Sequence, residues 1–91
     1  MEITWNPDKN AELKLRHGIG FESVLVAISD GRLLENRSHP SLGRYGHQRQ
    51  LIVEISFYAW VVPYVGDGET LFLKTMFPSR KATKRYLERR S

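Results

Sequence analysis

An alternating strand pattern followed by a glycine turn constrains the fold of this chain most. Apolar side chains occupy every second position of residues 51–57, which is typical of a strand with one buried face. Gly66-Asp67-Gly68 then predicts a hairpin turn into a strand over residues 69–77. In that strand we expect Leu71, Leu73 and Phe77 on one side and Phe72, Lys74 and Met76 on the other. The pattern predicts an antiparallel sheet.

Residues between these strands refine the prediction. A bend is expected within residues 57–60, where Trp60 is interpreted as a core residue, and a further strand over residues 61–65. Pro63 cannot donate a ladder hydrogen bond, so it indicates a bulge or an edge position.

The first half of the chain predicts two helices. A short strand over residues 3–5 precedes Asn6-Pro7, an N-cap followed by proline at the first helical position, and Gly18 ends that helix after His17. A second helix is expected to begin near Phe21, although its residues 24–28 would also suit a buried strand. A strand over residues 32–35 and a loop over residues 36–48 follow.

Length and composition predict a single domain spanning residues 1–91. We expect an α+β fold with four to five strands, two N-terminal helices on one face of the sheet and the other face open. The chain has no cysteine, which fits a reducing cytoplasm, and its start lacks the features of a signal peptide. Its longest apolar run, residues 51–65, is too short and too interrupted to cross a membrane.

Positive charge is concentrated at the end of the chain. Residues 79–91 hold six basic side chains and one acid, so the other 78 residues sum to −1 within the total of +4. Ser79 is a good N-cap, but a helix that begins at Arg80 has cations in its first turn, where each costs about 0.3–1 kcal/mol. Such a cluster favours a bound polyanion, because cation–phosphate contacts release counterions. A solvated tail is the alternative.

The chain resembles the BrnT family of toxins from bacterial toxin–antitoxin pairs. The first motif is Trp5-Asn6-Pro7-Asp8-Lys9 followed by Arg16-His17-Gly18 and Phe21-Glu22, and the second is Pro78-Ser79-Arg80-Lys81-Ala82-Thr83. The resemblance spans almost the whole sequence. It implies a RelE-like fold, an endoribonuclease that cleaves mRNA and stops translation, and neutralisation by a cognate antitoxin protein in a hetero-oligomer.

RNA supplies its own nucleophile, the 2′-hydroxyl group, so a small protein can cleave it with positioning and charge stabilisation and without a metal or another cofactor. Arg80 is the first catalytic candidate, because its guanidinium group and nearby backbone N–H groups could hold a phosphate. A surface ion pair is the alternative for this residue. The other catalytic candidates are His17, His47, Arg49 and Glu54.

Ordinary structural roles compete with catalysis at these positions. His17 could be an acid or a base, or it could cap its own helix. Glu54 could accept the 2′-hydroxyl proton, or it could form a cross-strand ion pair with Lys74. We expect RNA contacts from Lys9, Lys74, Lys81, Lys84 and Arg85. The histidines lack the spacing of metal ligands, so no metal site is predicted.

Two other function classes fit the same residues. A module that binds nucleic acid and blocks translation without cutting it needs the same basic surface. A partner-dependent protein could instead pair a strand that carries Trp60, Val62 and Tyr64 with another chain, as in a homodimer.

Overall fold

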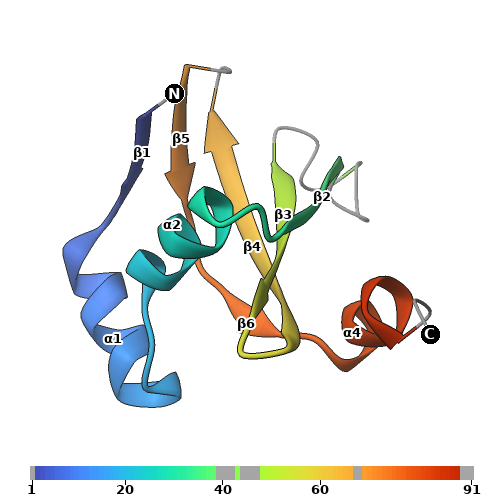
Figure 1. Cartoon of the computed structure of the whole chain (residues 1–91). Coiled ribbons are helices and arrows are strands. Elements are labelled where there is room, and N and C mark those ends of the chain that lie inside the picture. Colours follow the sequence, from blue (N-terminus) through green and yellow to red (C-terminus); the bar gives the residue numbers. More distant parts are fainter. Residues whose placement is uncertain (1, 39–42, 44–47, 67–68, 89–91) are drawn as a thin grey trace.

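The computed structural model describes residues 2–38, 43, 48–66 and 69–88, and it confirms an α+β fold. Figure 1 shows a twisted sheet with α1 and α2 on one side, and α4 apart from them, next to the C-terminus. The strand order is β1-β5-β4-β3-β2, and β6 also pairs with β4. The elements are β1 (Glu2–Trp5), α1 (Pro7–His17), α2 (Phe21–Ser29), β2 (Leu33–Ser38), β3 (Arg49–Ile55), β4 (Tyr58–Gly66), β5 (Thr70–Leu73), β6 (Phe77–Pro78) and α4 (Arg80–Tyr86).

The sheet is mixed, so the prediction of a purely antiparallel sheet is wrong for one strand. β1 pairs in parallel with β5, with Ile3 opposite Leu71, whereas the other strand pairs are antiparallel. Sequence pattern predicts that residues 3–5 form a strand, but it does not say which strand they join. The helices α1 and α2 follow β1 directly, and β1 takes the edge position beside β5.

The signals predicted for α1 are confirmed. Asn6 Oδ1 accepts hydrogen bonds from the backbone N–H groups of Asp8 and Lys9, at 2.8 and 3.3 Å. Gly18 ends the helix with φ of 81°, a left-handed conformation that glycine adopts without a Cβ penalty. Its apolar residues do not share one face, since Leu13 is fully buried but Leu15 is 91% exposed.

A buried asparagine joins α1 to α2. Asn10 Oδ1 accepts a hydrogen bond of 2.7 Å from the backbone N–H of Phe21, and Asn10 Nδ2 donates one of 2.9 Å to Glu22. A Cβ atom at Gly20 would clash with Asn10 Oδ1, so glycine permits this close approach. The first residues of α2 are thereby fixed against the middle of α1.

Both faces of the sheet carry buried clusters, so the prediction of an open face is wrong. The main cluster packs Leu13, Phe21 and Val24 against inward residues of β3, β4 and β5. The second cluster joins Ile52, Ala59, Val61 and Ala82, with Leu34, Tyr86 and Leu87 packed beside it. Helix α4 therefore covers part of the face opposite α1 and α2.

A tight two-residue turn joins β3 and β4. Ile55 pairs with Tyr58, and the turn residues Ser56 and Phe57 have φ of 53° and 65°. Two positive φ angles match a type I′ turn, which follows the twist of the strands but favours Asn and Gly. The bend predicted within residues 57–60 lies slightly earlier, at residues 56–57, because residues 58–60 already belong to β4. The strand predicted over residues 51–57 ends at Ile55.

The strand predicted over residues 69–77 is two strands, and Pro63 explains the interruption. The backbone carbonyl of Pro63 accepts a hydrogen bond of 2.8 Å from the N–H of Lys74, just after β5 ends. In a strand, the N–H and C=O of one residue point to the same neighbouring strand. Proline has no N–H, so Pro63 accepts a hydrogen bond from the β5 side but cannot donate one to it. Pro63 lies in the central strand β4, beside a break in its neighbour, and not at an edge of the sheet.

The break changes which side chains face the core. Met76 is buried in the main cluster, whereas Phe77 is 42% exposed, so the predicted sides of these two residues are wrong. The strand predicted over residues 32–35 also runs further, to Ser38, and shortens the expected loop. Residues 67–68 of the predicted hairpin turn lie outside the described residues, but β4 and β5 pair as antiparallel neighbours around them.

Candidate anion-binding site

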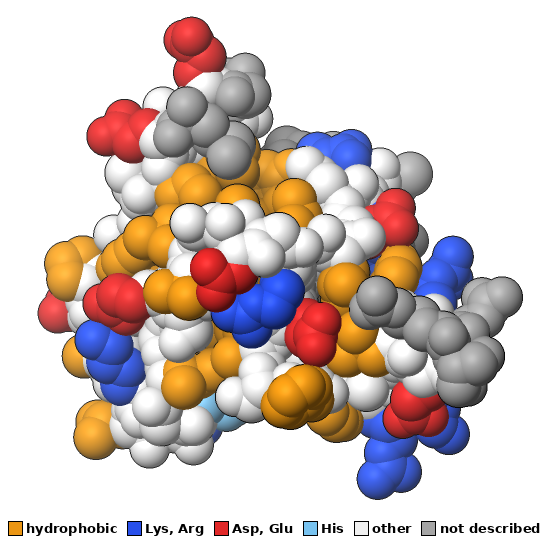
Figure 2. Space-filling view, viewed as in Figure 1, with side chains coloured by type: hydrophobic (Ala, Val, Ile, Leu, Met, Phe, Trp, Pro, Cys, Tyr) orange, Lys and Arg blue, Asp and Glu red, His pale blue; other side chains and the backbone are white. Residues whose placement is uncertain are grey.

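A depression with basic walls lies between β2 and α4. Its volume is about 260 Å³, and it is lined by Arg37, Ser79, Lys81, Ala82 and Arg85. Figure 2 shows Lys and Arg side chains gathered around α4. We call this the basic depression.

Arg37 belongs to the edge strand β2 and is held by its neighbour β3. It pairs in register with Gln50, and its Nε donates a hydrogen bond of 3.0 Å to Gln50 Oε1. Gln50 is 5% exposed, so it is a fixed acceptor. This contact orients the guanidinium plane of Arg37 in the wall of the basic depression, where bidentate contacts to a phosphate suit an arginine.

Two cations reach the basic depression from the same stripe of α4. Lys81 and Arg85 are four residues apart, so they are neighbours on the helix surface. Ser79 caps this helix, because its Oγ accepts a hydrogen bond of 3.0 Å from the N–H of Ala82. The guanidinium carbon of Arg85 lies 5.5 Å from the centre of the Tyr86 ring. No ion pair joins Arg37, Lys81 or Arg85 to an acid among residues 2–38, 48–66 and 70–87.

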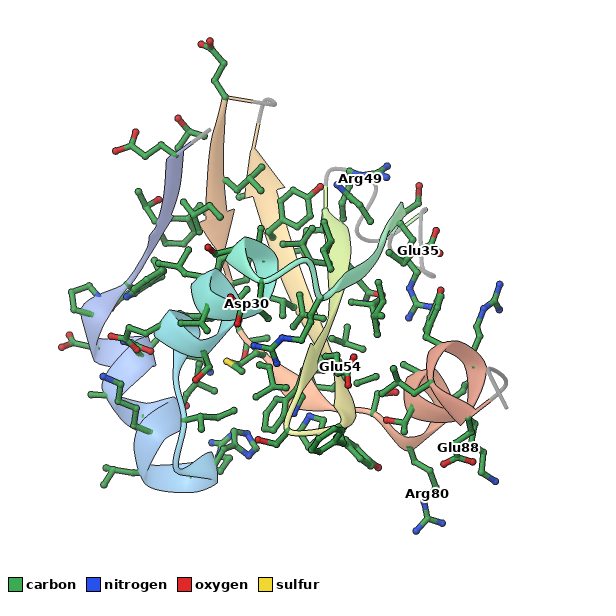
Figure 3. All side chains as sticks on the ribbon, viewed as in Figure 1. Asp30, Glu35, Arg49, Glu54, Arg80 and Glu88 are labelled. Atoms are coloured by element: carbon green, nitrogen blue, oxygen red, sulfur yellow. The ribbon has the colours of Figure 1, made fainter. Side chains whose placement is uncertain are left out.

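Arg80, the first catalytic candidate, lies on another stripe of α4. It shares that stripe with Lys84, and neither residue lines the basic depression. In Figure 3 the Arg80 side chain points away from the sheet into solvent. The cations of α4 thus form two groups, one beside β2 and one directed outward.

His17 and Arg49 lie on the face of the sheet that α1 and α2 cover. The His17 ring packs edge-on against Trp60, with ring centres 5.2 Å apart. Arg49 Nε donates a hydrogen bond of 3.1 Å to Asn36 Oδ1, which also accepts one from the Tyr64 hydroxyl group. Neither residue joins the lining of the basic depression. His47 lies outside the described residues.

Glu54 faces the same side as α4, because it pairs with Ala59 of the second cluster. The alternative of a cross-strand ion pair with Lys74 is wrong. β4 separates β3 from β5, and no ion pair joins these two residues within the described chain. Lys74 Nζ instead lies 5.5 Å from the centre of the Phe72 ring.

Lys9, a predicted RNA contact, belongs to α1 and forms an ion pair of 3.1 Å with Glu12. It is remote in the fold from the basic depression, since α1 and α4 pack on opposite faces of the sheet. Of the ten predicted site residues, the structure brings Lys81 and Arg85 together in one depression.

Sequence reasoning missed Arg37 and Gln50. The pattern of residues 36–48 predicts a loop, so it does not reveal the alternation that places Arg37 on the α4 side of β2. Glu35 belongs to the strand predicted over residues 32–35, but no local pattern places that strand beside α4. Glu35 pairs with Ile52 as Arg37 pairs with Gln50, so both residues point to the α4 side.

No group of His, Asp or Glu side chains within the described part of the chain is placed to hold a metal ion. No helix there is long and apolar enough to cross a membrane. No protein-family model matches this chain, and no curated protein and no solved structure is significantly similar to it.

Proposed function

We propose that this chain is a cytoplasmic RNA-binding protein that holds a phosphate of the RNA backbone in the basic depression. The toxin role and the RelE-like fold implied by the resemblance to BrnT belong to the same proposal. In this role the chain blocks translation until a cognate antitoxin covers its basic surface with acidic residues.

The lining of the basic depression carries the proposal. Arg37, Lys81 and Arg85 come from two elements that are remote in sequence, and no acid among residues 2–38, 48–66 and 70–87 pairs with them. Like charges brought this close repel one another unless an anion lies between them. RNA offers such an anion at each nucleotide of its backbone.

Cleavage of RNA is the second candidate function. It is favoured by Glu35, which shares the α4 side of β2 with Arg37 and lies two residues before it, about 6–7 Å along the strand. Figure 3 shows Glu35 on this part of the molecule. A carboxylate beside a gripped phosphate is a suitable acceptor for the 2′-hydroxyl proton as the 2′-oxygen bonds to phosphorus. The bond from phosphorus to the 5′-oxygen then breaks, and that oxygen takes up a proton from the carboxyl group or from water, while the arginine and lysine stabilise the charge on the phosphate.

A binding assay with labelled single-stranded RNA in EDTA tests the proposal. We expect the wild-type chain to shift the RNA, and Lys81→Gln/Arg85→Gln to weaken binding by about tenfold or more, since each charged hydrogen bond contributes about 1.5–3 kcal/mol. The matched control is Lys14→Gln/Arg16→Gln, which removes the same charge from α1 and should bind as the wild type does. RNA binding that is absent, or equally weakened by the control, would overturn the proposal.

The same assay separates binding from cleavage. Cleavage would give products with 5′-hydroxyl ends in EDTA, and Glu35→Gln should abolish them while the mobility shift is retained. Arg80→Ala tests in the same assay whether the outward stripe of α4 is needed for cleavage. RNA that is shifted but remains intact would support the binding function and would exclude cleavage of that RNA.

A further inference from the structure

A second depression lies on the α2 side of the molecule, next to the turn between β3 and β4. Its volume is about 270 Å³, and it is lined by Glu22, Ser23, Val26, Arg32, Ile55 and Ser56. We call it the turn depression. It shares no lining residue with the basic depression.

Phe57 protrudes from the turn that borders this depression. Its side chain is 89% exposed, and its φ of 65° is a left-handed conformation that is unfavourable for a bulky residue. An exposed phenylalanine contributes little to the stability of its own chain, and Asn or Gly would suit the turn better. Strain and exposure at one residue therefore indicate a contact made outside this chain.

We propose that the turn depression of one chain receives Phe57 of a second copy, so that two chains form a symmetric dimer. Ser56 lines the turn depression and Phe57 is the next residue, so the protruding ring and the receiving surface belong to one patch. A two-fold axis through such a patch makes each contact twice, which is the property of an isologous interface.

The turn depression has room for an aromatic ring. An engineered apolar cavity of about 150 Å³ binds benzene, so about 270 Å³ accommodates a phenylalanine ring. Val26 is 54% exposed and, with the largely buried Ile55, supplies the apolar part of the lining, whose other four residues are polar. An aromatic side chain that leaves water to fill such a depression is a typical interface anchor.

The charged groups in the turn depression already have partners. Glu22 accepts hydrogen bonds from Asn10 Nδ2 at 2.9 Å and from Lys14 Nζ at 3.1 Å. Arg32 forms an ion pair of 3.1 Å with Asp30. The site therefore requires no ionic ligand, and the acids around it disfavour RNA.

This dimer differs from one made by strand pairing. β4 lies between β3 and β5, and Val62 and Tyr64 are buried, so that strand cannot add another chain along its side. The hairpin tip offers a surface that is already exposed.

The test is the mass of the full-length chain by sedimentation equilibrium over a wide concentration range. We expect the wild type to reach the dimer mass, and Phe57→Asn to weaken dimerisation by about tenfold or more. Asn tolerates a positive φ, so this variant should remain folded by circular dichroism. Leu15→Gln is the control, because Leu15 is 91% exposed on α1 and outside the patch. A wild type that stays monomeric at every concentration, or Phe57→Asn that dimerises as tightly as the control, would overturn the proposal.

A mixing experiment tests the reciprocal geometry. Val26→Lys places a long charged side chain at the turn depression and should also prevent self-association. A dimer of either variant alone has no intact contact between a ring and a depression. A mixed dimer has one such contact, because Phe57 of the Val26→Lys chain can enter the depression of the Phe57→Asn chain. We expect the mixture to associate more tightly than either variant alone. Equal association in all three samples would contradict the reciprocal contact.

Discussion

Thr83 of α4 accepts a hydrogen bond of 2.9 Å at its Oγ1 from the backbone N–H of Ala59 in β4, 24 residues earlier. The same hydroxyl group donates to the carbonyl of Ser79 at 2.8 Å. Thr83 is 6% exposed, so both contacts are buried. This one side chain ties the short basic helix to the sheet and sets its distance from Arg37.

Thr83→Val should therefore destabilise the chain. Valine keeps the shape but leaves the buried N–H of Ala59 without an acceptor, at a cost of about 1–3 kcal/mol. Chemical denaturation followed by circular dichroism measures this loss. Thr83→Ser retains the hydroxyl group and is the control. An unchanged free energy of unfolding in Thr83→Val would show that the contact adds nothing to stability.

The stripe of α4 that faces β2 should set the salt dependence of RNA binding. Each phosphate contact contributes about −0.7 to the slope of log K against log salt for a single strand. Lys81→Gln and Arg85→Gln should each make the slope shallower by about that amount. Lys84→Gln, on the outward stripe of the same helix, is the matched control. A larger change in the control would assign binding to the outward stripe.

Removal of the Asn10 side chain should loosen the junction between α1 and α2. Asn10→Ala leaves the buried N–H of Phe21 unpaired, which costs about 1–3 kcal/mol. Gly20→Ala should destabilise the same junction, since its Cβ would clash with Asn10 Oδ1. Thermal unfolding measures both. If Gly20→Ala destabilises the wild type but has no further effect when Asn10→Ala is already present, the added Cβ clashes with the Asn10 side chain.

Glu22 should make stability depend on pH in the acid range. A hydrogen bond from its own backbone N–H, aided by those from Lys14 and Asn10, lowers the pKa of Glu22 below its ordinary value of 4.5, against a smaller opposing effect of burial. Because the pKa of Glu22 is lower in the folded state, its ionised carboxylate stabilises the fold at pH values above the pKa of the unfolded chain. This stabilisation is lost as pH falls through the folded pKa.

The matched variant for this effect is Glu22→Gln. The difference in free energy of unfolding between wild type and variant should favour the wild type at neutral pH and shrink as pH falls below 4.5. Urea unfolding at a series of pH values measures it. A difference that is constant with pH would contradict a stabilising carboxylate.

Phe57→Asn should raise the stability of the monomer. Asparagine accepts the left-handed conformation of a type I′ turn, where a bulky residue is strained by about 1 kcal/mol or more. Denaturation at low protein concentration isolates this effect from association. A loss of stability would show that the ring packs on its own chain.

Local signals in the sequence predicted the helices well. Asn6-Pro7 and Gly18 bound α1, and Ser79 begins α4, because capping depends on residues that are adjacent in the chain. The position of β1 and the break between β5 and β6 could not be predicted in the same way. Both depend on partners that are remote in sequence, β5 in the first case and Pro63 in the second.

The candidate site was predictable only in part. The charge cluster identified Lys81 and Arg85, but cations on one short helix separate into two stripes, and only packing decides which stripe faces the sheet. Arg37 reaches the same depression through the pairing of β2 with β3, and no local pattern links it to α4.

The parallel pairing of β1 with β5 has a consequence for synthesis. Residues 2–5 leave the ribosome well before residues 70–73, with which they pair, and the N–H of Glu2 bonds to the carbonyl of Glu69 at 2.7 Å. Such a distant pairing carries a large loop-closure entropy, so it forms late in folding. This edge of the nascent chain therefore stays unpaired until residues 70–73 have been translated.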